Sequence, residues 1–180
     1  MLGPTIVGER LTLAPIEPEH LPLFCRWFAD PEVTRYLLLT NPPSLKQEQE
    51  WYDAMCRDER RVNWGILVDG VMVGTTSIER IDWRNRHASS GTLIGDRTYW
   101  RRGLGSEAMR LRTAYGFREL NLEKMKSGAF AENVGSQRSL ERAGYRRVGL
   151  EEREIFRDGR WHDIMLYQIL REEWLARQPR

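Results

Sequence analysis

A basic turn with two glycines lies between a strand-like run and a helix-like segment of this chain. The run T-L-I-G (residues 92–95) comes first, the stretch Y-W-R-R-G-L-G-S-E-A (99–108) follows, and a helical period continues to about Arg118. A turn that opens a helix in this way presents free backbone N–H groups and the positive end of the helix dipole. Gly103 and Gly105 let a ligand approach the backbone closely. The sequence therefore predicts a site for a phosphate-bearing ligand.

The glycine spacing has two interpretations. The segment G-L-G-S-E-A fits G-x-G-x-x-G/A, the dinucleotide-binding fingerprint, and Glu123 stands about twenty residues further on. In a dinucleotide fold, however, the first glycine follows its strand closely and belongs to a doubly wound sheet. Here residues 96–102 separate Gly95 from Gly103, and hairpins come before them. We therefore disfavour a dinucleotide site.

Composition excludes several classes of function. The chain has 180 residues, 41% of them hydrophobic and 30% charged, which fits one soluble globular domain. The net charge of +2 argues against nucleic acid as a partner, and the apolar runs are too short for a membrane span or a signal peptide. Cys25 and Cys56 form no disulfide pattern, which favours the cytoplasm. The three histidines are scattered, so we expect no metal site.

Hairpins alternate with helical crossovers along the chain. Asp69-Gly70 and Asp158-Gly159 each separate two strand-like runs, which is a strong signal of a hairpin turn. Ser44 and Gln47 form a capping box at one helix start. This order predicts an α/β (α+β) fold with a mixed sheet. The expected strands are 5–13, 64–68, 71–81, 88–95, 124–130, 145–157 and 161–170, and the expected helices are 18–28, a turn or two within 32–38, 45–60, 103–118 and 133–143.

The second interpretation of the basic turn is a family resemblance. Read as Q/R-x-x-G-x-G/A, the segment W-R-R-G-L-G resembles the coenzyme A loop of the GNAT (Gcn5-related) N-acetyltransferases. Trp100 departs from the family's Gln/Arg, but Y-W-x-x-G-x-G is similar to the RimJ/RimL-type branch. Three further segments resemble that branch in the right order: H-L-P-L-F-C-R-W-F-A-D-P-E-V-T-R-Y-L (20–37), A-E-N-V-G-S-Q-R-S-L-E-R-A-G-Y-R-R-V-G (131–149) and R-D-G-R-W-H-D-I-M-L-Y-Q-I-L-R-E-E-W (157–174).

The resemblance implies a fold and an activity. The fold is a single GNAT domain over residues 1–180, with a mixed, mostly antiparallel sheet of six to seven strands, flanking helices and splayed central strands. The activity is direct transfer of an acetyl group from acetyl-CoA to a primary amine in a ternary complex. The acceptor is a protein N-terminus or a small molecule, and the sequence does not separate the two. A homodimer is compatible with this interpretation.

The resemblance also implies which residues hold acetyl-CoA. Backbone N–H groups of the turn hold the pyrophosphate, the strand before the turn pairs with the pantetheine arm, and an N–H near Ile94 stabilises the oxyanion. Asn133 contacts the coenzyme arm and also reads as a plain helix N-cap. The two arginines of the turn either lie near the phosphates or form a solvated surface pair. The expected cofactor-binding residues are Leu93, Ile94, Arg101, Arg102, Gly103, Leu104, Gly105, Ser106 and Asn133.

The catalytic residues are less clearly marked. Ser136 either contacts the coenzyme sulfur and protonates the leaving thiolate, or only helps to cap its helix. Many relatives carry an acid in an A-E-L/I-G segment, where this chain has Ser89. Polyamine-acetylating relatives carry a tyrosine where this chain has Leu140, which argues against polyamines. Glu79, Asp82, His87 and Glu154 are the candidate general bases, and we take Glu154 forward with Ser136 as candidate catalytic residues.

Three residues of the first helices are the candidates for binding the amine acceptor. Trp27, Arg35 and Tyr36 lie where the family's helices roof the acceptor site, although packing of an amphipathic helix pair is the simpler explanation for them. The missing acid at Ser89 also motivates an alternative function, a non-catalytic acyl-CoA sensor or interaction module on the same scaffold.

Overall fold

A computed structural model describes residues 1–39 and 41–178 of the chain. Its centre is one eight-stranded sheet with the order β1-β2-β3-β4-β5-β6-β8-β7. The strands are β1 (Ile6–Val7), β2 (Thr12–Ala14), β3 (Val62–Val68), β4 (Val71–Asp82), β5 (His87–Ile94), β6 (Lys124–Phe130), β7 (Arg146–Arg157) and β8 (Arg160–Leu170). The helices are α1 (Leu21–Phe28), α2 (Pro31–Thr34), α3 (Leu45–Arg57), α4 (Leu104–Arg118), α5 (Val134–Arg142) and α6 (Arg171–Leu175), with 3-10 turns at Pro18–His20 and Arg97–Tyr99.

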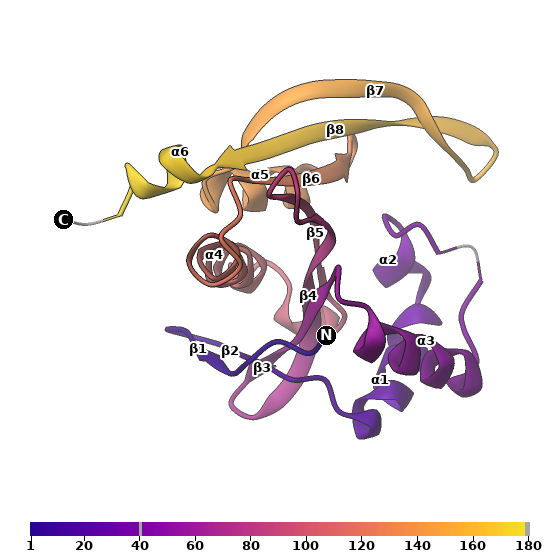
Figure 1. The fold of residues 1–180 in the computed structure, drawn as a ribbon. Coiled ribbons are helices and arrows are strands. Elements are labelled where there is room, and N and C mark those ends of the chain that lie inside the picture. The colour runs from indigo at the N-terminus through magenta and orange to yellow at the C-terminus, as the bar shows by residue number, and fades with distance from the viewer. Residues whose placement is uncertain (40, 179–180) are drawn as a thin grey trace.

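Helices cover both faces of the sheet. In Figure 1, α1, α2 and α3 lie on one side of β4 and β5, α4 lies on the other, and the long β7–β8 hairpin arches over the end of the sheet. None of the described helices is long and apolar enough to cross a membrane. Because β4 is covered on both faces, its side chains are buried along most of its length.

Local sequence signals account for several boundaries. Asp69 and Gly70 have φ angles of 50° and 79°, and Asp158 and Gly159 have 51° and 73°. Positive φ at both central residues is the type I′ geometry that matches the twist of a hairpin. The predicted capping box is confirmed, since the Ser44 side chain accepts from the N–H of Gln47, whose side chain in turn accepts from the N–H of Ser44.

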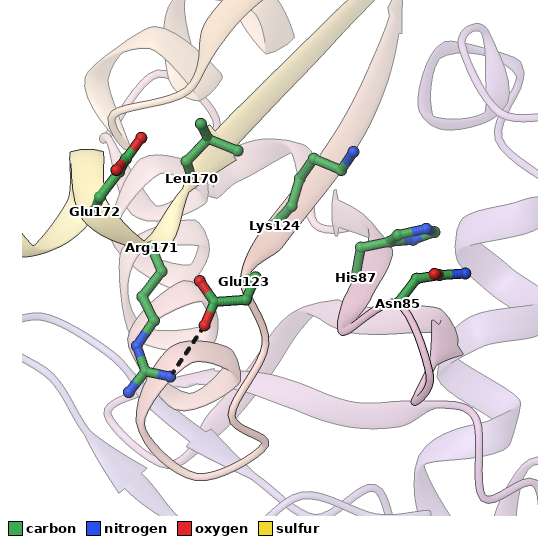
Figure 2. Close-up of a pocket in the computed structure, with 7 residues that line it drawn as sticks. All are labelled: Asn85, His87, Glu123, Lys124, Leu170, Arg171 and Glu172. Atoms are coloured by element: carbon green, nitrogen blue, oxygen red, sulfur yellow. Dashed lines mark ion pairs between the residues drawn. The ribbon is translucent and has the colours of Figure 1, made fainter.

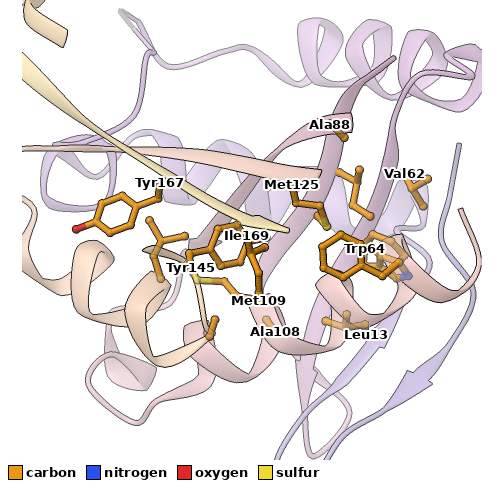
Figure 3. Packing of buried hydrophobic residues seen from close by; sticks show 14 of the residues in the cluster. Leu13, Val62, Trp64, Ala88, Ala108, Met109, Met125, Tyr145, Tyr167 and Ile169 are labelled. Atoms are coloured by element: carbon orange, nitrogen blue, oxygen red, sulfur yellow. The ribbon is translucent and has the colours of Figure 1, made fainter. Parts of the chain in front are cut away.

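Two hydrophobic clusters lie on opposite faces of the sheet. Figure 3 shows the larger cluster, in which Trp64 of β3 and Met125 of β6 pack over the α4 residues Ala108 and Met109. The smaller cluster joins α1 and α3 to the other face and includes Trp27 and the partly buried Leu93. Each face of the central strands is therefore held by its own helices.

The predicted fold class is confirmed, with one more strand than expected. The segment 5–13 folds as two short strands, β1 and β2, rather than one. The chain bends between them at Glu9 and Arg10, and the N–H of Glu9 donates to the Glu107 carboxylate at 2.8 Å. The helix expected over 18–28 begins as a 3-10 turn, and the helix expected over 45–60 ends at Arg57.

The central strands diverge, as the family resemblance predicts. β5 and β6 are the parallel pair of the sheet, and their pairing covers only His87–Ser89 against Lys124–Lys126. Two serine hydroxyls bridge the last contact: Ser90 Oγ donates to the Lys126 carbonyl at 3.0 Å and Ser127 Oγ to the Ser90 carbonyl at 3.1 Å. Beyond these bonds the carboxyl ends of β5 and β6 separate and leave a gap at the centre of the sheet.

A buried acid on α3 makes the stability of this fold depend on pH. Glu48 is 6% exposed, and burial raises the pKa of its carboxyl above the ordinary 4.5. The folded chain therefore binds this proton more tightly than the unfolded chain, so ionisation of Glu48 costs stability as the pH rises through its folded pKa. We expect Glu48→Gln to have a higher free energy of unfolding than the wild type at about pH 8, and an unchanged one at about pH 4.

Urea unfolding at the two pH values measures this effect. Glu50→Gln is the matched control, because the Glu50 side chain lies on the same helix and is 67% exposed. If Glu48→Gln and Glu50→Gln raised the free energy of unfolding equally, or if Glu48→Gln raised it at low pH, burial of the Glu48 carboxylate would not be the cause.

Candidate functional site

The basic turn builds an anion cradle at the start of α4. Gly103 is the N-cap with φ 77°, which favours glycine, and has no side chain to cap the helix. The Arg101 backbone also has a positive φ of 61°. The first backbone bond of α4 runs from the N–H of Glu107 to the carbonyl of Gly103. The N–H groups of the residues before Glu107 therefore point out of the helix start, where an anion can accept from them.

Two further features of this helix start suit a ligand. Ser106 is 4% exposed, yet its hydroxyl has no hydrogen-bond partner within the described chain. A buried hydroxyl without a partner is costly unless something binds to it. A Cβ added at Gly105 would meet nothing within 4 Å, so the backbone here borders open space. These features suit a phosphate-bearing ligand.

An ion pair that the sequence did not signal holds the turn in place. Glu107 of α4 is 3% exposed, and its carboxylate accepts from the N–H groups of Glu9 and Arg10 and from the Arg10 side chain at 2.8–2.9 Å. Arg10 also donates to the carbonyl of Arg102 at 2.8 Å and to that of Gly103 at 3.4 Å. Since these carbonyls turn toward Arg10, the N–H groups of the turn are left for a ligand.

Burial and hydrogen bonding act in opposite directions on Glu107. Burial raises the pKa of this carboxyl. The hydrogen bonds from Arg10 and Glu9 and the charge of Arg10 lower the pKa by more than burial raises it, so the net pKa lies below 4.5. Glu107 is therefore ionised at neutral pH, as the Arg10 contact requires.

The edge of β5 presents backbone groups to the gap. The N–H of Gly95 donates to the Val73 carbonyl at 2.9 Å, which makes Gly74 and Ile94 a non-hydrogen-bonded pair. By the alternation of an antiparallel ladder, Thr92 and Ile94 direct their N–H and C=O groups away from β4 and toward β6. The carbonyl of Ile94 is taken by the Trp100 indole N–H at 2.8 Å. Trp100, the position that departs from the family pattern, thus ties the turn to the strand.

A buried arginine of α4 holds β5 to β4 through hydrogen bonds. Arg112 of α4 is 0% exposed and donates to Thr76 Oγ1 at 2.8 Å, to Thr92 Oγ1 at 2.6 Å and to the Gly91 carbonyl. It therefore links β4 and β5 next to the point where β5 and β6 part. The helical period of this segment did not indicate a buried cation at this position.

The α5 residues stand at the other side of the gap. The Asn133 side chain accepts from the N–H of Ser136 at 3.0 Å, which confirms its role as an N-cap. Three residues separate the end of β6 from the start of α5, so both residues lie at the carboxyl end of the parallel pair. Ser136 is partly buried. Contact of either side chain with a coenzyme remains a prediction.

A cavity of about 310 Å³ opens on the face of β4 and β5 that α1–α3 cover, opposite to α4. Glu79 lies in it and accepts a hydrogen bond from Ser77 Oγ at 2.7 Å. Glu79 is also the direct cross-strand partner of Ser89, the position where many relatives carry an acid. Cross-strand partners lie about 5 Å apart, so the carboxylate of Glu79 stands close to the place of the missing one. The cavity is lined by Phe28, Leu37, Leu38, Leu39, Thr75, Ser77, Glu79, Gly91, Thr92 and Leu93.

The other three candidate bases lie elsewhere. Figure 2 shows His87 in a second cavity, of about 370 Å³, at the far end of β5, where Glu123 is paired with Arg171 at 3.8 Å. Asp82 lies 3.9 Å from His87, and hydrogen bonds from Asn85 lower its pKa, which weakens it as a base. Glu154 is exposed on β7 and lines neither cavity. The described residues contain no cluster of His, Cys, Asp and Glu that could hold a metal ion.

The three predicted acceptor residues have different surroundings. Trp27 is 6% exposed, stacks on Phe24 at 5.5 Å and packs against the backbone of Gly95, which supports the end of β5. The ring of Tyr36 lies 5.6 Å from that of Phe130 and so links the segment after α2 to the end of β6. Arg35 is exposed beside Tyr36. The structure does not bring these three side chains together in one cavity.

Comparison with known proteins identifies the family. The profile described as "Acetyltransferase (GNAT) domain" matches residues 10–146. The chain belongs to the GNAT acetyltransferase family. It is 31% identical to the "Uncharacterized N-acetyltransferase p20" of Bacillus licheniformis over 94% of this chain and 98% of that protein. It is 27% identical to the "Alpha/beta-tubulin-N-acetyltransferase 9" of Mus musculus over 81% of this chain and 65% of that protein.

A solved structure supports the fold of this GNAT chain. The spermidine N-acetyltransferase from Vibrio cholerae, crystallised with CoA and spermine, superposes with a TM-score of 0.87 and 21% identity, over 93% of this chain and 99% of that one. The matching relatives are N-acetyltransferases, and enzymes of the GNAT family use acetyl-CoA. The anion cradle and the free edge of β5 are consistent with that donor.

Proposed function

We propose that this chain is an acetyl-CoA-dependent N-acetyltransferase of the RimJ/RimL type that acts on a primary amine by direct transfer in a ternary complex. One observation carries the proposal: the anion cradle at Gly103–Ser106 adjoins the free edge of β5 at the carboxyl end of the parallel strand pair. Crevices at the carboxyl ends of parallel strands are common ligand sites. We propose a single domain over residues 1–180 and, because Cys25 and Cys56 are both free, a cytoplasmic location.

The donor site divides into three parts. Backbone N–H groups of Leu104, Gly105 and Ser106 hold the pyrophosphate, with Arg101 and Arg102 adding charge. The edge of β5 pairs with the pantetheine arm through the backbone groups of Thr92 and the N–H of Ile94, and the side chain of Leu93 borders the acceptor cavity. Acetyl-CoA supplies an acetyl group activated as a thioester. Asn133 and Ser136 close the far wall, and Ser136 is the proton donor to the departing sulfur.

Glu79 is the general base in this proposal. An alkylammonium has a pKa near 10.4, so at neutral pH the amine must lose a proton before it can attack. Glu79 replaces our expectation of Glu154, because Glu79 lines the cavity beside Thr92 and Leu93 of β5 and Glu154 lines neither cavity. The N–H of Ile94 or Thr92, directed into the gap, is placed to stabilise the oxyanion. The absence of an acid at Ser89 was the reason to consider a non-catalytic acyl-CoA sensor. Because Glu79 is the cross-strand partner of Ser89 and supplies a carboxylate there, that reason no longer favours the sensor.

Substitution at Gly105 tests the donor site. We expect Gly105→Val to weaken acetyl-CoA binding by about tenfold or more, because its side chain fills the open space beside the N–H groups without a clash in the protein. Isothermal titration calorimetry measures the affinity and thermal unfolding measures the fold. Gly149→Val on β7 is the control, since its Cβ meets only ordinary contacts with Leu166 at 3.5 Å. Unchanged affinity in a folded Gly105→Val variant would refute the donor site.

A further inference from the structure

The cavity beside Glu79 has a polar end and an apolar body. Ser77 and Glu79 supply the polar end at β4. Leucines 37–39, after α2, form an apolar wall together with Phe28 and Leu93. Leu38 is 73% exposed, so a large apolar side chain stands in water at the mouth of the cavity. An exposed apolar surface that adjoins a polar group at a site indicates a ligand with both characters.

The charges around the cavity are few and partly compensated. Glu79 is the one charged residue among the described residues that line it. Arg61 lies 3.5 Å from the Glu79 carboxylate and is itself 25% exposed, so a cation already stands near the acid. An acceptor with two or more amino groups would place its further ammonium groups against leucine side chains or toward Arg61. Burial of an ammonium without a partner is costly.

We propose that the acceptor is a small monoamine, a single primary amino group on an apolar alkyl or aryl body, and that its body lies against Leu37–Leu39. This inference rests on the proposed function. A cavity of about 310 Å³ has room for about ten water-sized groups, the size of an arylalkylamine. The amino group reaches Glu79 and the apolar body covers Leu38. Polyamines, which the Vibrio cholerae enzyme reported above is named for, lack the partners that they need here.

The reaction on such an acceptor balances as follows. The amine nitrogen forms a bond to the acetyl carbonyl carbon, and the carbon–sulfur bond of the thioester breaks. The ammonium loses two protons to become the amide: one leaves through Glu79 to solvent, and the other replaces the proton that Ser136 gives to the sulfur, which departs as the free thiol of coenzyme A. No oxidant, reductant or metal takes part in this balance.

Steady-state kinetics with three acceptors tests the proposal. We expect kcat/KM for 2-phenylethylamine to exceed that for spermidine, and that for a peptide with a free N-terminus, by about tenfold or more. A higher kcat/KM for spermidine or for the peptide would overturn the proposal.

Leu38→Glu sharpens the test, because it places a carboxylate at the mouth of the cavity. This substitution should lower kcat/KM for 2-phenylethylamine and raise it for spermidine, each by about tenfold. Leu45→Glu is the control, since Leu45 is 53% exposed on α3 outside the cavity. If Leu38→Glu and Leu45→Glu have the same effect on kcat/KM for 2-phenylethylamine and for spermidine, the cavity does not select the acceptor and the proposal is wrong.

The experiment separates this inference from the proposed function. Binding of acetyl-CoA is measured by calorimetry, and release of coenzyme A by a thiol assay. If acetyl-CoA binds and none of a broad panel of amines is acetylated, the proposed function itself fails. If acetylation occurs with polyamines or peptides in preference to monoamines, the proposed function stands and only this inference falls.

Discussion

Glu79→Gln is expected to lower kcat by about 10²–10⁴-fold, the usual contribution of a general base. Glutamine keeps the size of the side chain and an oxygen that can accept from Ser77, but it cannot take the proton of an ammonium. The acetyl-CoA affinity should stay unchanged, because the anion cradle lies on α4 and Glu79 lies on β4, on the face of the sheet covered by α1–α3. Steady-state kinetics and calorimetry on the same variant measure the two quantities.

Glu154→Gln is the matched control for this prediction. Glu154 is an exposed acid on β7, and its replacement should leave kcat within about twofold of the wild type. If Glu154→Gln lost activity and Glu79→Gln kept it, the base would belong on β7 and the role of Glu79 would be refuted. A loss of acetyl-CoA affinity in Glu79→Gln would instead indicate a structural role.

Short-range signals in the sequence predicted much of the fold. The two Asp-Gly turns, the Ser44 capping box and the Asn133 cap each depend on residues within a few positions of one another, and each is confirmed. The split of segment 5–13 into two strands was missed, because the acceptor that fixes the turn, Glu107, is about 100 residues away in sequence.

The parts of the site that could not be predicted depend on register and on distant contacts. Ser89 suggested a missing acid, but only the pairing of β4 with β5 reveals that Glu79 is its direct partner. Arg10 and Glu107 are 97 residues apart, and no local pattern connects them. A buried arginine such as Arg112 looks, in sequence, like any charged residue on a helix. Motifs thus indicate the proposed donor site, whereas the proposed base and acceptor cavity can be found only from the folded sheet.

Glu107→Ala is expected to lower the free energy of unfolding by about 2–4 kcal/mol and to weaken acetyl-CoA binding as well. The substitution leaves the N–H groups of Glu9 and Arg10 without their acceptor and the Arg10 side chain without its partner. The expected cost lies below that of breaking a fully buried ion pair, because the Arg10 side chain is 50% exposed. Since Arg10 also holds the carbonyls of Arg102 and Gly103, the cradle loses its preorganisation.

Glu107→Gln separates the charge from the shape of this contact. Glutamine retains one acceptor oxygen, so it should lose less stability than alanine. The folded pKa of Glu107 is lowered, so its contribution is complete above the ordinary value of 4.5 and is lost as the pH falls through the folded pKa. The stability difference between wild type and Glu107→Gln should therefore narrow below about pH 4. Glu119→Ala, at an exposed acid beyond the end of the same helix, is the control and should change neither stability nor affinity. A Glu107→Ala variant that lost stability but bound acetyl-CoA with wild-type affinity would show that the cradle keeps its geometry without Arg10, and the link from the β1–β2 turn to the donor site would have to be abandoned.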